Sequence, residues 1–425
     1  MLDIKYIEEN AELVKENMKK KFREDLNIVD DCITKYNDYK RLLKEVQDLK
    51  TEKNKASEEI NRLKKAGEDA SGVITKMKEI PAKIKELEEK VQTTQIDMET
   101  LQKNIPNMLH ETVPIGKDES ENVVIAEYGE KTEKDFEILG HVELCEKLGI
   151  ADFEKSSKAS GNGFFYLKNE LVMLNQALIR FAMDFMRRRG FMLVEPPLML
   201  RKEVLLTVMP PGDFEEHAYK IDGEEQYLIA TSEHALLSMF YKTVIDKKEL
   251  PIKMAGYSQC FRQEIGAHGI DEKGLFRTHQ FNKVEMVTIC EPEESYKMYE
   301  EMLGYSVELF KELGLSTRVF ESCSGDLGDL KSKGADLEVW SPRRKEYFEV
   351  CSVSNITDNQ ARRMDLKVFD GEKRYYPHTL NNTAIATSRA MVAILENYQN
   401  ADGSVTIPDA LVPYMDGISK IERKE

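Results

Sequence analysis

Two long stretches near the start of the chain place apolar residues at alternating steps of four and three positions, which is the repeat of a coiled coil. The first stretch runs from Ile28 to Leu63 and the second from Val73 to Ile105. Between them, residues 64–72 are polar and contain two glycines. The pattern predicts two matched helices joined by a short turn, which fold back as an antiparallel hairpin with arms about 50 to 60 Å long.

Details of the repeat qualify this prediction. Lys35 and Lys53 occupy seam positions and weaken the apolar repeat, and Pro81 predicts a kink near the tip of the second helix. Before the hairpin, residues 2–22 form a shorter amphipathic pattern that predicts one helix. Its expected apolar side consists of Ile4, Ile7, Leu13, Val14 and Met18. An isolated coiled coil of this kind most often serves as an oligomerisation or spacer element.

The composition changes after the hairpin. Ile105 is followed by proline, and residues 113–121 have the proline, glycine and charge of a linker. We therefore expect an N-terminal domain over residues 1–110 and a second domain over residues 111–425. Alternating helical and strand patterns in the second domain predict an α+β fold with a largely antiparallel sheet and flanking helices. The expected strands are residues 163–167, 191–195, 226–230, 252–261, 281–289, 336–340 and 347–353, and the expected helices are 170–188, 295–313 and 387–398.

Composition narrows the classes of function. The formal net charge of −16 argues against indiscriminate nucleic-acid binding, so any such contact must use local basic patches. The chain has neither an apolar run of about twenty residues, as a membrane span requires, nor the apolar core of a signal peptide. The six cysteines are scattered without the close pairs of a zinc site. We expect a cytoplasmic protein with no membrane contact, reduced thiols and no zinc.

Candidate chemistry is concentrated in residues 260–285. Strand alternation would put Arg262 and Glu264 on one face. If the return run is one continuous strand, a single face also carries Arg277, His279, Phe281, Lys283 and Glu285. Cations, an aromatic ring and a carboxylate together suit an anionic, aromatic ligand. The alternative is a solvated strand with alternating charges.

Four separated signatures resemble class II aminoacyl-tRNA synthetases, and from the hairpin to the C-terminus the chain is similar to the seryl-tRNA synthetases. Arg189 to Pro197 resembles motif 1, which implies a homodimer interface, although paired prolines also simply end strands. Residues 260–285 resemble motif 2. Thr379 to Arg389 resembles motif 3, with departures at Thr383, Ala384 and Thr387 that are typical of the archaeal branch. The resemblance implies a class II catalytic domain with an antiparallel sheet, preceded by an all-α, tRNA-binding arm.

The fourth signature, Thr231-Ser232-Glu233, resembles the serine-binding loop of the family, although it would also suit a helix cap. By resemblance, serine is bound by Thr231, Ser232, Glu233, Arg262, Glu285, Asn381 and Thr383. ATP is bound by Arg262, Gln263, Glu264, Arg277, Thr278, Phe281, Glu349, Val350, Cys351, Ser352 and Arg389. Arg262, Arg389 and Glu349 are the implied catalytic residues, because guanidinium groups suit phosphate oxygens. Glu349 and Ser352 would hold Mg²⁺ with ATP. The alternative for Cys351 is a packed, inert thiol.

The implied function is that of a serine–tRNA ligase. Serine and ATP would form seryl-adenylate, and the seryl group would pass to the 3′ end of tRNA(Ser), and of tRNA(Sec) where present, with release of pyrophosphate and AMP. Residues 265–274 would meet that 3′ end. Arm residues available for phosphate contacts are Lys40, Arg41, Lys44, Arg62, Lys64, Lys65, Lys76 and Lys78, although solvated helices carry lysine in any case.

Two rival functions remain at this point. The first is a related enzyme that transfers the activated amino acid to a carrier protein, but such relatives lack the long arm. The second is a non-catalytic coiled-coil interaction protein with a degenerate catalytic domain. The intact set Arg262, Glu264, Glu285, Glu349 and Arg389 argues against the second.

Overall fold

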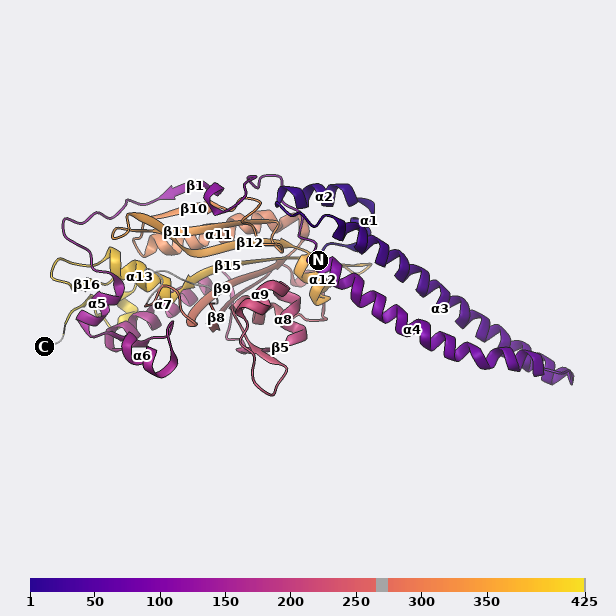
Figure 1. Ribbon diagram of the computed structural model, residues 1–425. Helices are drawn as coiled ribbons and strands as arrows, with labels where there is room; N and C mark the ends of the chain where they lie inside the picture. The colour runs from indigo at the N-terminus through magenta and orange to yellow at the C-terminus, as the bar shows by residue number, and fades with distance from the viewer. Residues whose placement is uncertain (265–273, 424–425) are drawn as a thin grey trace. The chain divides into compact units, whose positions relative to one another are not determined.

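The computed structural model describes residues 1–264 and 274–423 (Figure 1). The chain divides into two compact units, Met1–Met108 and Leu109–Glu425. The assignment of the first unit to tRNA binding and of the second to catalysis stays a prediction at this stage. No helix in the described ranges combines the length and the apolar character that a bilayer span requires.

The first unit begins with two short helices where one was predicted. They are α1 (Ile4–Glu9) and α2 (Ala11–Lys20), separated by Asn10, whose backbone leaves helical geometry at φ −125° and ψ 33°. The Asn10 side chain donates to the Tyr6 carbonyl at 3.0 Å, the kind of local bond by which asparagine ends helices. Ile7, Val14 and Met18 are buried as expected, but Leu13 is 47% exposed. The prediction for Leu13 was wrong because the break changes the register of the buried side.

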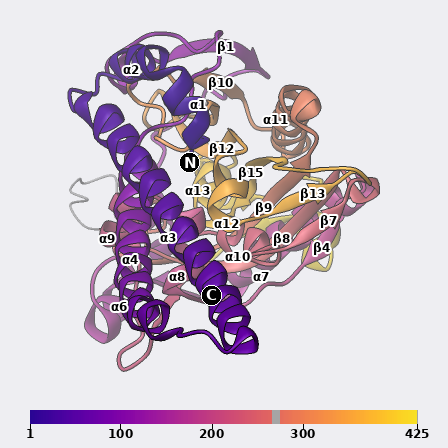
Figure 2. The ribbon, with the colours of Figure 1, turned by 90° about the vertical axis from the view of Figure 1, so that its right-hand side faces the viewer.

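The predicted hairpin is present as α3 (Asn27–Ala66) and α4 (Ser71–Asn104), which run side by side in Figures 1 and 2. With 40 residues, α3 is about 60 Å long. Gly67 ends α3 in the left-handed conformation, at φ 71°. The seam lysine Lys35 forms an ion pair with Asp97 of the facing helix at 2.8 Å, so its charge is paired within the hairpin. Pro81 lies inside α4.

Among the described residues, the second unit is built on an eight-stranded sheet in the order β1-β10-β11-β12-β15-β9-β8-β4. Its neighbouring strands are antiparallel except for the parallel pair β4 and β8, which confirms the predicted largely antiparallel sheet. The strands are β1 (Val123–Tyr128), β4 (Met192–Val194), β8 (Ile252–Phe261), β9 (Gln280–Cys290), β10 (Thr317–Glu321), β11 (Lys333–Ser341), β12 (Glu346–Thr357) and β15 (His378–Ala386).

Helices cover the sheet and complete the core. The predicted helix over residues 170–188 is α7, and its apolar side, Leu171 to Phe185, is buried. Helix α11 packs against β12 and β15, while α7 and α13 pack together. The helices of this unit are α5 (His141–Leu148), α6 (Phe153–Ser160), α7 (Asn169–Arg188), α8 (Lys202–Val208), α9 (Pro211–His217), α10 (Ser232–Ser238), α11 (Ser295–Glu312), α12 (Asn359–Met364) and α13 (Thr387–Asn397).

Smaller strands and 3₁₀ turns complete this unit. The strands pair as β2 (Ala151–Asp152) with β3 (Tyr166–Leu167), β5 (Met199–Arg201) with β6 (Gln226–Leu228), β13 (Lys367–Phe369) with β7 (Val244–Asp246) and β14 (Arg374–Tyr375), and β16 (Val405–Thr406) with β17 (Lys420–Ile421). The 3₁₀ turns are Glu119–Glu121, Lys247–Glu249, Pro292–Glu294 and Val412–Met415.

Candidate active site

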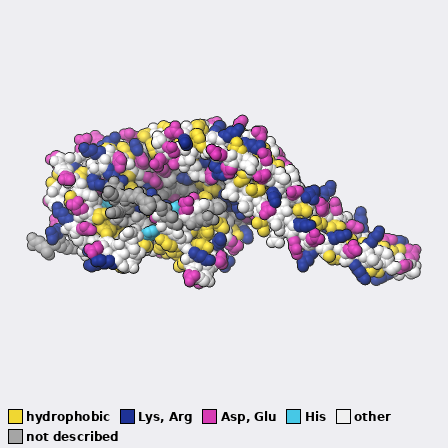
Figure 3. All heavy atoms as spheres, in the orientation of Figure 1, with side chains coloured by type: hydrophobic (Ala, Val, Ile, Leu, Met, Phe, Trp, Pro, Cys, Tyr) yellow, Lys and Arg dark blue, Asp and Glu magenta, His cyan; other side chains and the backbone are white. Residues whose placement is uncertain are grey.

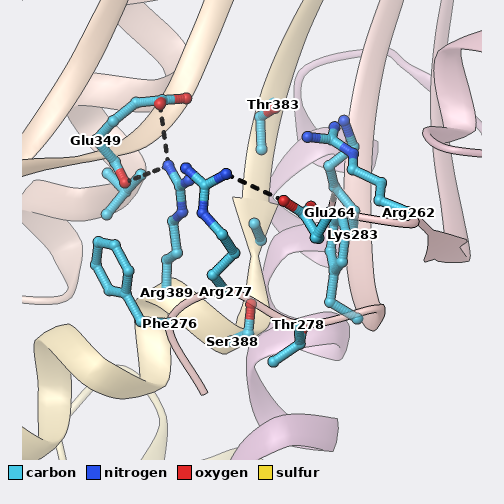
Figure 4. A pocket seen from close by; sticks show the side chains of 13 residues that line it. Arg262, Glu264, Phe276, Arg277, Thr278, Lys283, Glu349, Thr383, Ser388 and Arg389 are labelled. Atoms are coloured by element: carbon cyan, nitrogen blue, oxygen red, sulfur yellow. Dashed lines mark hydrogen bonds and ion pairs between the residues drawn. The ribbon is translucent and has the colours of Figure 1, made fainter. Parts of the chain in front are cut away.

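A polar pocket of about 260 Å³ opens over the central strands of the sheet (Figure 4). Strands β9, β12 and β15, the start of α13 and the segments between β8 and β9 contribute to it, so segments far apart in the sequence meet in one cavity. Its lining residues are Arg262, Glu264, Phe276, Arg277, Thr278, Phe281, Lys283, Glu349, Val350, Thr383, Ala386, Ser388 and Arg389. The charge of the lining, with several cations and few carboxylates, favours an anionic ligand.

Two arginines enter one side of the pocket, each beside a carboxylate (Figure 4). Nη1 of Arg389 lies 3.0 Å from Glu349 Oε2 and donates to the Glu349 carbonyl oxygen at 2.9 Å. Nη1 of Arg277 donates to Glu264 Oε2 at 3.1 Å. Burial acts to raise the pKa of Glu349, but the charge and hydrogen bond of Arg389, together with the charges of Lys331 and Arg262, outweigh burial, and the net pKa lies below its ordinary value. Glu349 therefore stays ionised at neutral pH.

Arg262 follows directly after β8 and is held from two directions. Its Nε donates to the Ala230 carbonyl oxygen at 3.2 Å, and its guanidinium carbon lies 5.3 Å from the centre of the Phe281 ring. Because Nε is the anchored nitrogen, the two terminal nitrogens remain as a fork for an oxyanion.

The turn into α10 carries the residues predicted to bind serine. Thr231 caps this helix, because its hydroxyl accepts from the Glu233 backbone N–H at 3.2 Å. The Thr231 hydroxyl therefore acts as a helix cap, which was the alternative to serine binding for this segment. Ser232 is fully buried, and its hydroxyl lies 2.7 Å from that of Ser258. Glu233 Oε1 accepts from the side-chain amide of Asn381 at 3.1 Å.

Strand β15 presents alternate residues to the carboxylates of the site. Asn381 meets Glu233, and the Thr383 hydroxyl donates to Glu285 Oε2 at 3.2 Å. The same oxygen of Glu285 lies 2.8 Å from Lys283 Nζ, and both side chains of this ion pair are buried. Burial, with a further contribution from Glu285, raises the pKa of Glu233 to about 7. Two carboxylates, Glu233 and Glu285, thus accept hydrogen bonds from side chains of β15.

Comparison with known proteins gives the family. The model of the seryl-tRNA synthetase N-terminal domain matches residues 1–109, and that of the tRNA synthetase class II core domain (G, H, P, S and T) matches residues 217–398. A serine–tRNA ligase of Methanocella arvoryzae is 45% identical, with 98% of this chain and 99% of the relative covered. The chain belongs to the seryl-tRNA synthetase family.

Solved structures of the family agree with this assignment. The seryl-tRNA synthetase of Pyrococcus horikoshii complexed with ATP superposes with a TM-score of 0.93 at 42% identity, over 100% of both chains. The cytoplasmic serine–tRNA ligase of Naegleria fowleri in complex with AMP superposes with a TM-score of 0.88 at 31% identity, over 100% of this chain and 99% of the other. The predicted family, class II fold and ligase activity are confirmed.

Some predicted site residues of the synthetase are not among those that line the pocket. The Gln263 side chain is bound to a distant part of the backbone, since its Nε2 donates to the Ala218 carbonyl oxygen at 2.8 Å. Cys351 is 1% exposed and belongs to the hydrophobic core, where burial raises the pKa of its thiol. Ser352 and Glu285 also lie outside the lining, and Glu285 contacts it through Lys283 and Thr383.

The strand expected over residues 281–289 is present as β9 (Gln280–Cys290), but the condition of one continuous strand over residues 277–285 is not met. Strand β9 begins at Gln280, so strand parity does not apply to Arg277 and His279. Arg277 nevertheless lines the pocket, whereas Nδ1 of His279 lies 2.9 Å from the Arg262 carbonyl oxygen and 3.0 Å from the Tyr219 hydroxyl. His279 therefore supports the backbone of Arg262. The predicted tRNA-facing loop, residues 265–274, falls outside the described residues except for Gly274.

The donor set near Glu349 fits magnesium. Ser352 pairs in register with Asp336 of β11, and burial together with Glu349 raises the pKa of Asp336. Two neighbouring carboxylates and a hydroxyl are hard oxygen donors, as Mg²⁺ prefers when phosphates complete its coordination. Within the described ranges, no group of three or more His, Cys, Asp or Glu side chains is arranged to hold a metal alone.

Sequence reasoning missed several residues at this site. Phe276 and Ser388 line the pocket, and Asp336 faces the Glu349 region from β11. Lys283 was expected on the polar face but received no role. Strand alternation marked Lys283, but the other three residues have no spacing that marks them, because they reach the site through the way distant segments pack. For Phe276 and Asp336, aromatic or acidic character was the only signal in the sequence.

Proposed function

We propose that the pocket binds ATP and L-serine side by side and forms seryl-adenylate, and that the seryl group then passes to the 3′ end of tRNA(Ser). The observation that carries this proposal is the polarity of the site. Arg277 and Arg389 enter the pocket beside Glu264 and Glu349. Glu285 contacts Lys283 and Thr383 of the lining, and Glu233 accepts from Asn381 on the same strand as Thr383. The first group suits a triphosphate and the second suits an ammonium and a hydroxyl.

ATP is assigned to the arginine side. The Phe281 ring, already stacked under Arg262, offers a face for adenine, and the Glu264 carboxylate can accept from its amino group. Arg277 and Arg389 then meet the phosphates, and Arg389 lies in the first turn of α13, where the helix dipole also favours anions. The proposed ATP site also includes Gln263, Val350, Cys351 and Ser352, which would contribute backbone groups or lie next to residues that contact ATP.

Serine is assigned to the Glu233 side. Its ammonium and hydroxyl would be bound by Glu233, Glu285 and Thr383, with Thr231, Ser232 and Asn381 supporting them. Alanine would leave these buried polar groups unpaired, which disfavours it strongly. Arg262, at the junction of the two sides, would hold the serine carboxylate and the α-phosphate together.

The chemistry needs no protein base. An oxygen of the serine carboxylate attacks the α-phosphorus, and the bond to pyrophosphate breaks. In the second step the 3′-terminal ribose hydroxyl of tRNA attacks the activated carbonyl carbon, and AMP leaves. Arg262, Arg277 and Arg389 neutralise charge and fix the geometry. Mg²⁺, held by Glu349 and Ser352 with Asp336 nearby, would supply further neutralisation of the phosphates when bound.

The helical arm is assigned to tRNA. Basic and acidic side chains alternate along its surface (Figure 3). Three of the predicted contacts already form ion pairs: Arg41 and Arg62 with acidic residues of the arm, and Lys40 with Glu8 of α1. Such exposed pairs contribute little, so phosphates can compete for these cations. We include tRNA(Sec) as a substrate where it is present, and we place the reaction in the cytoplasm.

A homodimer is assigned to motif 1, Arg189 to Pro197. Strand β4 of this motif lies at one end of the described sheet, and Met192 on it is 49% exposed. An exposed apolar side chain on an edge strand is suited to burial against a second copy. The Arg189 guanidinium stacks on Phe185 at 3.3 Å from the ring centre and so is held rigidly beside this edge.

Two assays with the purified chain test the function. Serine-dependent exchange of pyrophosphate into ATP measures activation, and attachment of labelled serine to tRNA(Ser) measures transfer. We expect both activities, with threonine and alanine giving far less exchange. Absence of exchange would refute the enzyme assignment. Exchange without charging of tRNA would favour transfer to a carrier protein.

A further inference from the structure

A chain of buried hydrogen bonds lies behind Glu233, and its outer members carry no assigned role. Gln360, in α12, is 1% exposed. Its Nε2 donates to Glu233 Oε1 at 2.7 Å and to the Val208 carbonyl oxygen at 3.3 Å. Its Oε1 accepts from the hydroxyl of Thr379, which is fully buried on β15, at 2.7 Å. Four segments of the fold therefore meet at one side-chain amide.

This network leaves the amide a single orientation. The Val208 carbonyl can only accept hydrogen bonds, so the amide nitrogen must face it. The same nitrogen then has its second hydrogen directed to Glu233, and the amide oxygen faces Thr379. If the amide were flipped, its oxygen would face the Val208 carbonyl oxygen and the Glu233 carboxylate, and neither contact would be a hydrogen bond. Gln360 is thus a fixed donor to Glu233 and not an adaptable one.

The consequence for Glu233 is an asymmetric carboxylate. Oε1 accepts from both Gln360 and Asn381. Among the described residues, Oε2 accepts no hydrogen bond, so this oxygen is available to a ligand. The charged groups that act on Glu233 are Glu285, which disfavours its ionised form, and Lys283 and Lys331, which favour it together with the Gln360 amide.

We propose that Gln360, itself held by Thr379, is a positioning residue that fixes Oε1 of Glu233 so that Oε2 meets the substrate serine. The proposal rests on the assignment of Glu233 to serine in the proposed function. Two amide donors on Oε1 set the plane of the carboxylate and stabilise its charge. They also exclude Oε1 as a partner for the substrate, which limits the positions that a serine ammonium or hydroxyl can take.

The test compares variants of the full-length chain by serine-dependent exchange. Gln360→Leu should raise the KM for serine about 10- to 100-fold, because Glu233 loses a donor to its charge, while the KM for ATP stays within about twofold. The acid side of the pH profile of kcat/KM for serine should also move to higher pH, since the protonated form of Glu233 becomes easier to form. Thr379→Val should shift the KM for serine and the pH profile in the same direction but by less. Thr379→Ser, which keeps the hydroxyl, should behave like the wild type.

Asn382→Ala provides the matched control. Asn382 is an equally buried amide on β15 that donates to the Met302 carbonyl and the Ser306 hydroxyl, both at 2.8 Å, on the opposite face of the strand. Its loss should lower the melting temperature without moving the pH profile or the KM for serine.

A Gln360→Leu enzyme that behaves like Asn382→Ala, or that loses ATP and serine affinity equally, would overturn the proposal. If Gln360→Leu does not fold, an unchanged KM for serine in Thr379→Val would overturn it. Failure of the wild-type chain to catalyse exchange would instead refute the proposed function, so the two failures are distinguishable.

Discussion

The ion pair between Lys283 and Glu285 is the feature of the site whose energy can be worked out most directly. The two charged atoms are 2.8 Å apart, and the side chains are 8% and 2% exposed. At an effective dielectric constant of about 20, their attraction is about 6 kcal/mol, most of which offsets the cost of removing both charges from water. Removing one partner leaves a buried charge with that cost and no attraction.

We therefore expect Lys283→Met to destabilise the protein by about 3 to 5 kcal/mol, and Glu285→Gln to have an effect of similar size. The double variant should be more stable than the sum of the two losses predicts, with a coupling free energy of at least about 2 kcal/mol. The Thr383 hydroxyl, 3.2 Å from Glu285 Oε2, can still donate to a glutamine at this position.

Urea unfolding followed by tryptophan fluorescence measures this coupling. The chain has one tryptophan, Trp340 on β11, so its signal follows the second unit without a contribution from the arm. Exchange activity is measured in parallel, and the double variant should regain stability without regaining serine activation. Additive losses within about 0.5 kcal/mol would show that the pair is effectively solvated and would refute the reasoning.

Three further predictions follow from the site and the arm. Arg262→Lys keeps the charge but loses the Nε bond to Ala230 and the planar fork, so exchange should fall about 100- to 1000-fold; a loss below about tenfold would remove Arg262 from the reacting centre. Glu233 must be ionised to bind the serine ammonium, and its pKa is raised to about 7 by burial and by Glu285. The kcat/KM for serine should therefore fall as the pH drops through about 7, whereas a profile flat from about pH 6 to 8 would contradict this assignment. Deleting residues 40–90 of the arm should leave exchange within about twofold and abolish charging of tRNA(Ser); equal loss of both activities would show that the arm also serves activation.

The elements with a strong period were predictable because local pattern alone defines them. The coiled-coil repeat located α3 and α4, and the amphipathic run over residues 170–188 located α7. The sheet was harder. Strands β1, β10 and β15 were not predicted, and β15 in particular carries His378, Thr379, Asn381 and Asn382 where a buried strand usually carries apolar residues. Its polar side chains form hydrogen bonds with α11 and with the site, which no local pattern reveals.

The site residues also divide into those that local sequence identifies and those that depend on contacts between distant segments. Arg262, Glu264, Phe281 and Arg389 could be named from motifs, and the pocket contains all of them. Asp336 and Gln360 could not be, because each reaches the site through pairing or packing of elements distant in the sequence. The parity argument failed at His279 because the chain turns before β9 begins, and alternation holds only within a strand.

The alternation of β15 separates two kinds of change in the synthetase. Thr379, Asn381 and Thr383 face the carboxylates of the site, whereas Asn382 holds the strand to α11 from the other side. We expect substitutions on the first face to alter which amino acid is accepted while the backbone keeps its position. This strand is therefore a natural place for selection, or for directed evolution, to retune amino-acid choice in small steps without first rebuilding the scaffold.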